Sequence, residues 1–477
     1  MPGTTRYKPY LVLFIIYLFF SIPYSPFFES LGYDKEVFQY IGMIIKNHLH
    51  PYSDVFDHKP PIIYLLNYLG VLITANSTWG IFLIMNIIGF SSSIFIYQLA
   101  TNKFKTALFP IVIATVFICV NNNNSILQGG NLTRQLAAFL ITGLIFLVFN
   151  FKKTNFTQTL AGILIGIIFF TQQNEILGGL ILIAYSVLFE KKFSLYSSKR
   201  ILKNITFFTI GVLIPTFFIL SIIYHWNNYD DFMNQVFLFN FENYLEKKSF
   251  IIKITNIIYR FFYILISNKI LLVILLLTVI NLIITIIKEK LEKIDPKLII
   301  LVIAFAFQLI SSSISGKTYG HYFLMFIPYL TCIFIFSFNK KDYRNINYLS
   351  FTLLGVITFF SIKNISYKEP NNILLDMVIN QVYSVKNTHG QFYSFNARYL
   401  RVNFNLNITS PSEYVYTHFM NEENYKELII DLKKNNTKYI LYSSKSNNFP
   451  QELTSFITLN YSEVLNHDGY ILCKNNN

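Results

Sequence analysis

The 477-residue chain has few charged residues and few cysteines. Asp, Glu, Lys and Arg make up 13% of it, whereas ordinary soluble domains contain roughly a quarter. The three cysteines, Cys119, Cys332 and Cys473, are widely separated, and the first two lie in apolar runs. This pattern excludes a disulfide framework and a cysteine-based metal site, and it predicts small core residues. Hydrophobic residues reach 53%, so the composition predicts a polytopic membrane protein.

Basic residues outnumber acidic ones, and the formal net charge is +14. The Lys and Arg residues lie mainly in short loops between apolar runs, which is the pattern that orients membrane helices. We therefore expect these charges to meet membrane lipids, and we expect no nucleic-acid partner.

The apolar runs predict a mainly α-helical bundle over residues 1–362 with about eleven spanning helices, at roughly 20 residues per span. The expected spans are 9–26, 78–100, 105–120, 135–150, 157–170, 175–189, 204–224, 262–287, 298–314, 320–338 and 346–362. The two shortest, 157–170 and 175–189, could instead form one re-entrant pair joined at residues 171–175.

Alternate loops are basic, which sets the orientation of the chain. The basic loops, expected in the cytoplasm, contain Arg6 and Lys8, Lys103 and Lys105, Lys152 and Lys153, Lys191 to Lys203, Lys288 to Lys297, and Lys340 to Arg344. The first long loop, residues 28–77, and the C-terminal segment then lie outside. The sequence predicts a multi-pass plasma-membrane protein with a cytoplasmic N-terminus and an extracytoplasmic site.

Residues 363–477 have a soluble composition and predict a small extracytoplasmic α/β domain. Apolar residues recur at helical spacing over 425–432, residues 438–442 resemble a strand, and a turn at 467–469 precedes a last strand at 470–473. This segment has no nucleophile triad, metal-ligand spacing or glycine-rich phosphate loop. We therefore expect an accessory role for it.

The first outer loop concentrates ionisable residues beside the apolar spans: Asp34, Glu36, Asp54, Asp57, His58 and Lys59. Such clusters usually mark a site. An apolar stripe from Val37 to Leu49 predicts a helix in the membrane interface, with Asp34 as its N-cap. Simpler explanations are that Asp34 is only a cap, that Asp54 and Asp57 are turn residues, and that Lys59 is an interface anchor.

The sequence Asp57-His58-Lys59-Pro60-Pro61 opens the next helix. Prolines suit a first helical turn because its amides lack intrahelical partners. The helix start carries a positive partial charge to which Lys59 adds its ammonium. This position is therefore suited to an anion such as phosphate.

The loop also resembles a known family. Asp34 near its start, PYSDVFDHKPP at residues 51–61, GGNLT at 129–133, and GHYF at 320–323 with Pro328 are similar to the GT-C membrane glycosyltransferases. The similarity is to bacterial relatives of protein O-mannosyltransferases and of the lipid A aminoarabinose transferase. It covers residues 1–360 in organisation.

The resemblance implies transfer of a sugar from a polyprenyl-phosphate donor to a lipid, polysaccharide or protein acceptor, outside the bacterial inner membrane and with inversion. It implies that Asp34 takes the acceptor proton or orients the acceptor hydroxyl. Lys59, with Asp57 and His58, would bind the departing phosphate. His321 and Tyr322 would contact phosphate or sugar from the opposite side, although His321 could also be a helix-end residue at the interface.

One position departs from the family pattern. Similar proteins commonly place acidic residues after the GGNLT motif, whereas this chain has Arg134-Gln135. Arg134 could make a bidentate phosphate contact instead, or could face lipid headgroups. The candidates for a second carboxylate are Glu36, Asp54, Glu175, Asp230 and Asp231. A divalent metal ion is possible, and no ligand for it is predicted.

Two other classes compete with a glycosyltransferase. Many helices with polar residues also describe a transporter or lipid flippase, but the charges gather at one membrane face and no inverted repeat is found. The Arg134 departure keeps a catalytically inactive GT-C-like scaffold open.

Overall fold

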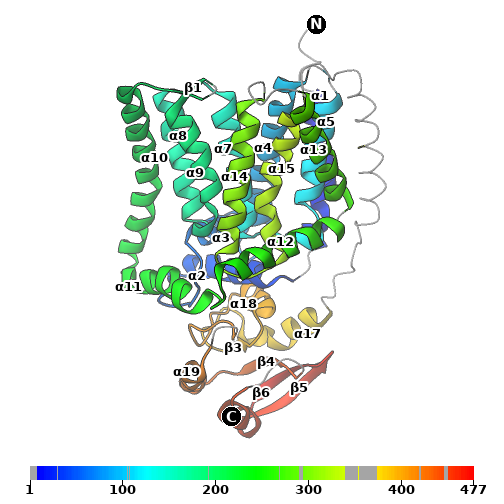
Figure 1. Cartoon of the computed structure of the whole chain (residues 1–477). Helices are drawn as coiled ribbons and strands as arrows, with labels where there is room; N and C mark the ends of the chain where they lie inside the picture. The colour runs from blue at the N-terminus through cyan, green and yellow to red at the C-terminus, as the bar shows by residue number, and fades with distance from the viewer. Residues whose placement is uncertain are drawn as a thin grey trace.

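The computed structural model describes residues 8–28, 31–104, 106, 108–191, 193–267, 269–288, 294–338, 353, 373–417, 420–444 and 449–476. It shows a helical bundle followed by a small α/β domain (Figure 1). The predicted fold class, mainly helical with a small C-terminal α/β domain, is confirmed at this level.

The bundle contains fifteen α-helices within the described residues. They are α1 (Lys8–Ser21), α2 (Tyr33–Lys46), α3 (Ile62–Thr74), α4 (Trp79–Lys103), α5 (Leu108–Asn121), α6 (Asn124–Leu127), α7 (Thr133–Asn150), α8 (Asn155–Phe169), α9 (Leu177–Leu188), α10 (Ser198–His225), α11 (Tyr229–Met233), α12 (Phe250–Ser267), α13 (Lys269–Lys288), α14 (Pro296–Ser313) and α15 (Ile327–Ser337).

Short segments connect these helices. They are the 3-10 turns η1 (Ile22–Tyr24), η2 (Gln173–Glu175) and η6 (Gly320–Phe326), the π-helical turns η3 (Asn234–Leu238) and η4 (Asn240–Tyr244), and the strand pair β1 (Phe189–Lys191) and β2 (Ser194–Leu195).

Five described segments are long and apolar enough to cross a membrane, namely α4, α7, α10, α14 and Gly320–Ser337. Helices α1, α3, α5, α8 and α9 are apolar but shorter. The count of about eleven spans stays a prediction, because the last expected span, 346–362, lies outside the described residues except for Leu353.

One of the expected spans differs from the structure, and the structure also bears on the two short spans. The expected span 262–287 joins the end of α12 to α13, whereas the structure has two helices there, and α12 runs obliquely at the lower end of the bundle (Figure 1). The segments expected at 157–170 and 175–189 are separate helices, α8 and α9, connected by η2.

The centre of the bundle is formed by α7 and by η6 with α15, whose residues are mostly buried. Helix α10 lies at the edge of the bundle and packs mainly on α8. Gly162 and Gly211 allow this close approach, since a Cβ at either would lie 2.1 Å from a backbone oxygen of the opposite helix.

The C-terminal domain lies below the bundle, on the same side as α2 and α11, whereas α1 begins and β1 lies at the opposite end (Figure 1). The first loop and this domain thus share one end, as the predicted topology requires. The assignment of that end to the extracytoplasmic side stays a prediction.

The C-terminal domain is a four-stranded sheet between two helical layers. Its elements are α17 (Ile373–Val382), β3 (Phe392–Ser394), α18 (Leu400–Leu406), α19 (Glu422–Lys434), β4 (Tyr439–Ser443), α20 (Gln451–Asn460), β5 (Tyr461–His467) and β6 (Tyr470–Asn475). The strand order is β3-β4-β6-β5, with β3 parallel to β4 and the other pairs antiparallel.

Alternation along β4 builds both cores of this domain. Tyr439 and Leu441 pack in the cluster with α17 and α18, and Ile440 packs in the cluster with α19 and α20. The predicted helix, strand and final hairpin are therefore confirmed as α19, β4 and β5–β6. The three cysteines are buried, as predicted for small core residues.

Candidate functional site

Helix α2 places Asp34 in its first turn. The sequence predicted Asp34 as the N-cap of this helix, but the N-cap is Gly32. The Gly32 amide donates to the Glu36 carboxylate (3.4 Å). Asp34 is half-buried, and a carboxylate in a first helical turn is favoured by the helix dipole. The ten residues Lys35–Ile44 are all buried, so α2 is enclosed by α3 and α18 rather than lying on an open surface.

Asp57 is buried and anchors the segment that precedes α3. Its carboxylate accepts hydrogen bonds from the hydroxyls of Tyr64 (2.7 Å) and Tyr416 (3.0 Å) and from the His58 amide (2.7 Å). Burial raises the pKa of Asp57, although Lys59 and these hydrogen bonds oppose the shift. Tyr416 belongs to the C-terminal domain, which therefore contacts this segment directly.

Lys59 is 9% exposed. Its ammonium lies 5.3 Å from the centre of the Tyr244 ring, and it forms no hydrogen bond or ion pair with any described residue. The His58 ring lies over the same tyrosine at 4.7 Å. Pro60 and Pro61 precede α3 rather than occupying its first turn, which leaves Lys59 just outside the helix start.

Arg134, near the start of α7, faces η6 and η2. Its Nε donates to the Glu175 carboxylate (2.7 Å), and its guanidinium lies 3.3 Å from the centre of the Tyr322 ring. Glu175 also accepts hydrogen bonds from Ser312 (2.6 Å) and Gln308. A second carboxylate is thus present beside Arg134, and it is already neutralised by that arginine.

A left-handed turn at residues 128–131 positions His321. All four residues have positive φ, from 49° at Gln128 to 95° at Gly129, which the two glycines tolerate without strain. Gln128 Oε1 lies 2.9 Å from His321 Nδ1. With this oxygen as acceptor, His321 carries its proton on Nδ1 and presents Nε2 to Arg134 Nη1 at 3.4 Å.

Tyr244 links the two sides of the site. Its ring contacts His58 and Lys59, and its hydroxyl lies 3.5 Å from that of Tyr322. It comes from η4, and π-helical turns are frequent at functional sites. Burial raises the pKa of Tyr244 and of Tyr416, and the charge of Asp34 adds to both shifts. Asp34 therefore acts electrostatically on tyrosines from both sides of the site.

No protein-family model matches this sequence, and no curated protein matches it significantly. Solved structures do match. ArnT from Cupriavidus metallidurans in the apo state aligns with a TM-score of 0.66 and 11% identity, over 99% of this chain and 98% of that chain. The same protein bound to undecaprenyl phosphate gives a TM-score of 0.65 and 10% identity over the same shares. ArnT is a GT-C membrane glycosyltransferase.

The chain shares the overall fold of ArnT. The resemblance predicted over residues 1–360 is therefore confirmed at the level of the fold, and the alignment covers 99% of this chain. The archaeal oligosaccharyltransferase from Archaeoglobus fulgidus aligns at a lower TM-score of 0.49, with 14% identity over 93% of this chain and 70% of that chain.

Within this fold, the structure gathers most of the predicted site residues around Tyr244. Those gathered are Asp57, His58, Lys59, Arg134, Glu175, His321 and Tyr322, with Asp34 at the start of α2.

Four candidate carboxylates lie elsewhere or are occupied. Glu36 is fully buried and paired with Arg401 of α18, whose Nε and Nη2 donate at 2.7 and 2.9 Å. Asp54 is exposed and accepts from the His50 amide (2.7 Å), as a turn residue would. Asp230 and Asp231 belong to the surface helix α11. Residues 234–244 and 416, which complete the site, carried no recognisable sequence motif.

The described residues contain no group of three or more His, Cys, Asp or Glu side chains placed to hold a metal ion. The buried carboxylates of the candidate site, Asp57 and Glu175, already have tyrosine, serine and arginine partners. The residues present therefore do not form a recognisable metal site, and no step below uses a metal.

Proposed function

We propose that this chain is a glycosyltransferase that moves a sugar from a polyprenyl-phosphate donor to a hydroxyl-bearing acceptor. The observation that carries the proposal is Lys59, a buried ammonium that makes no hydrogen bond or ion pair with the described residues. Burying a charge without a partner costs several kcal/mol, and a donor phosphate would offset that cost. The ArnT structure with undecaprenyl phosphate shows that a protein of this fold binds such a lipid.

The phosphate position follows from the charges around Tyr244. Arg134 pairs directly with Glu175, whereas Lys59 makes no ion pair with a described residue and interacts with Asp57 only electrostatically. The phosphate would therefore bind the Lys59 ammonium, in the segment that leads into α3. His321, with its proton on Nδ1, would leave Nε2 between Arg134 and the ligand.

The acid–base role falls to Asp34. Among the candidate carboxylates, Glu36, Asp54, Asp57 and Glu175 all have partners, whereas the half-buried Asp34 makes no hydrogen bond or ion pair with the described residues. Asp34 would accept the proton of the acceptor hydroxyl while the hydroxyl oxygen forms a bond to the anomeric carbon of the donor sugar. The bond from that carbon to the phosphate oxygen breaks, and Lys59 stabilises the released phosphate. Attack opposite the leaving phosphate inverts the anomeric configuration.

The C-terminal domain would orient the loop rather than react. Tyr416 bonds Asp57, Arg401 bonds Glu36, and the Phe56 amide donates to the Glu413 carbonyl (3.0 Å). The domain thus holds both the start of α2 and the segment that carries Lys59.

The proposal is tested with purified protein in proteoliposomes. The donor is undecaprenyl phosphate that carries a radioactive sugar. Transfer of this sugar to lipid, glycan and peptide acceptors is measured, and solute movement across the bilayer is measured in parallel. We expect transfer without solute movement. Movement without transfer would identify a transporter or flippase, and the absence of both would identify a scaffold.

A further inference from the structure

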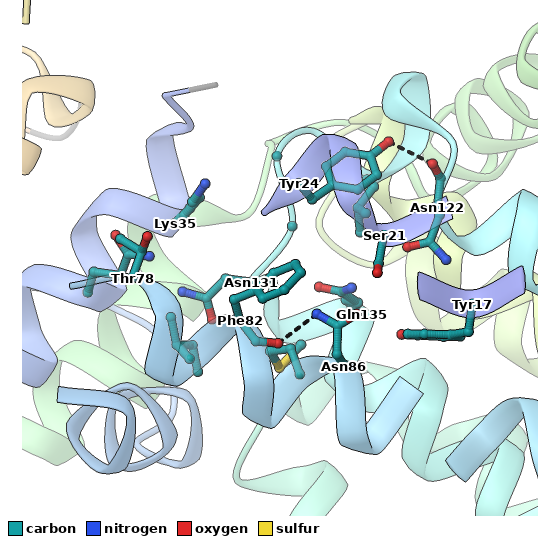
Figure 2. A pocket seen from close by; sticks show the side chains of 16 residues that line it. Tyr17, Ser21, Tyr24, Lys35, Thr78, Phe82, Asn86, Asn122, Asn131 and Gln135 are labelled. Atoms are coloured by element: carbon teal, nitrogen blue, oxygen red, sulfur yellow. Dashed lines mark hydrogen bonds between the residues drawn. The ribbon is translucent and has the colours of Figure 1, made fainter. Parts of the chain in front are cut away.

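A small cavity with both apolar and polar side chains in its wall borders the site at the turn of residues 128–131. It has a volume of about 40 Å³, and its wall includes Gly129 and Gly130, which follow the His321 partner Gln128. Figure 2 shows side chains from α1, α2, α4 and α7 around it, with Lys35, Asn131 and Gln135 labelled among them.

The cavity wall contains amide groups without hydrogen-bond partners. Gln39 is 1% exposed, and neither its Oε1 nor its Nε2 has a partner. Gln135 is also buried, and its Oε1 is unpartnered, as is Asn86 Oδ1. Buried polar groups are almost always paired, because leaving one unpaired is unfavourable. Several unpaired amides around one cavity therefore indicate a polar ligand.

The size and chemistry of the cavity indicate which ligand. About 10–15 Å³ of such space holds one water, so the cavity holds about three waters or a few hydroxyl groups. A hydroxyl donates and accepts, as an amide does. Ile81, Phe82 and Met85 form an apolar part of the wall, which suits the C–H surface of a sugar ring.

The cavity and the phosphate site are built from neighbouring residues. On α2, Asp34 belongs to the proposed reaction site and Lys35 to the cavity; on α7, Arg134 contacts Glu175 and Tyr322, while Gln135 lines the cavity. Successive helical residues point about 100° apart, so each helix start supplies both compartments. A sugar joined to phosphate by one bond would span such adjacent compartments.

We propose that this cavity is the subsite for the hydroxyl edge of the donor sugar, with Gln39 and Gln135 as its hydrogen-bonding residues. This inference rests on the proposed function and names the position at which the donor sugar is selected.

The test compares four lipids in nanodiscs: undecaprenyl phosphate alone, and the same lipid carrying glucose, mannose or galactose. We expect the wild-type protein to bind at least one sugar-bearing lipid more tightly than the sugar-free lipid. Gln39→Leu should reduce that preference roughly 3- to 10-fold, the contribution of one hydrogen bond, and should leave the sugar-free affinity unchanged. Gln135→Leu provides the same measurement from another helix.

The matched control is Gln158→Leu. Gln158 is equally buried, but it lies on α8 and donates to Ser186 (3.0 Å) outside the cavity. It should leave the sugar preference intact. The melting temperature of unliganded Gln39→Leu should not fall, because the lost amide has no partner there.

Three outcomes would overturn the inference. Equal affinity of the wild-type protein for all four lipids excludes a sugar subsite. If Gln39→Leu and Gln135→Leu lose as much affinity for the sugar-free lipid as for the sugar-bearing lipids, the two glutamines have only a structural role. Wild-type protein that binds none of the lipids contradicts the proposed function itself, and the inference with it.

Discussion

Replacing Lys59 with methionine should weaken binding of undecaprenyl phosphate strongly. Methionine keeps the unbranched stem and removes only the charge. An ammonium and a phosphate oxygen about 3 Å apart attract by about 5 kcal/mol at an effective dielectric constant of 20. Removing one partner of a buried charge pair costs about 2–5 kcal/mol, which corresponds to roughly 30- to 5,000-fold in Kd. Lys59→Arg should restore binding only partly, because a planar fork replaces a point charge.

The same variant should change the stability of the unliganded protein little, since the Lys59 ammonium makes no hydrogen bond or ion pair with the described residues and only its electrostatic effect on Asp57 is lost. The matched control is Lys317→Met. The Lys317 ammonium lies 5.9 Å from the same Tyr244 ring, but it pairs with Glu246 (3.5 Å) and is more exposed. The assay measures Kd in nanodiscs and melting in detergent. Wild-type affinity in Lys59→Met would refute the reasoning and make Lys59 an interface anchor.

Three further predictions concern the first loop and its support. Arg401→Ala removes the cationic partner of the buried Glu36 carboxylate and should cost roughly 3–5 kcal/mol of stability; an unchanged melting temperature would contradict a structural role for this pair. The pKa of Asp57 is raised in the folded protein, so the folded state holds this proton more tightly than the unfolded state. The melting temperature of wild type, compared with that of Asp57→Asn, should therefore fall as the pH rises above about 4. A melting temperature that rises relative to Asp57→Asn over this range would contradict the raised pKa. A cysteine introduced at the exposed position Ser53 should react with an impermeant thiol reagent in intact cells, whereas the native cysteines are buried. Labelling only after lysis would show that the topology is the reverse of the predicted one.

The sequence predicted the helices wherever an apolar run ends in polar or turn residues. Helix α7, for example, begins at Thr133 and was expected from residue 135. The break between α12 and α13 was missed because the expected span 262–287 was drawn through the three polar residues Ser267, Asn268 and Lys269, at which the apolar run is interrupted. Strand β3 was missed because it has only three residues.

The ionisable part of the site was visible in the sequence because charges are rare and costly beside membrane spans. The cap role of Asp34 was wrong, since the Gly32 amide is satisfied by Glu36 instead. Tyr244 and Tyr416 gave no signal, being two of 33 tyrosines. The Arg134–Glu175 pair spans 41 residues and is created only by the packing of α7 against η2.

The central claim is tested most directly by the sugar-transfer rate of Asp34→Asn in the proteoliposome assay. Because Asp34 does not cap α2, this change should alter neither melting nor undecaprenyl phosphate binding. We expect transfer to fall by about 10²- to 10⁴-fold, the usual contribution of a positioned acid or base. Transfer at the wild-type rate by Asp34→Asn would contradict the account.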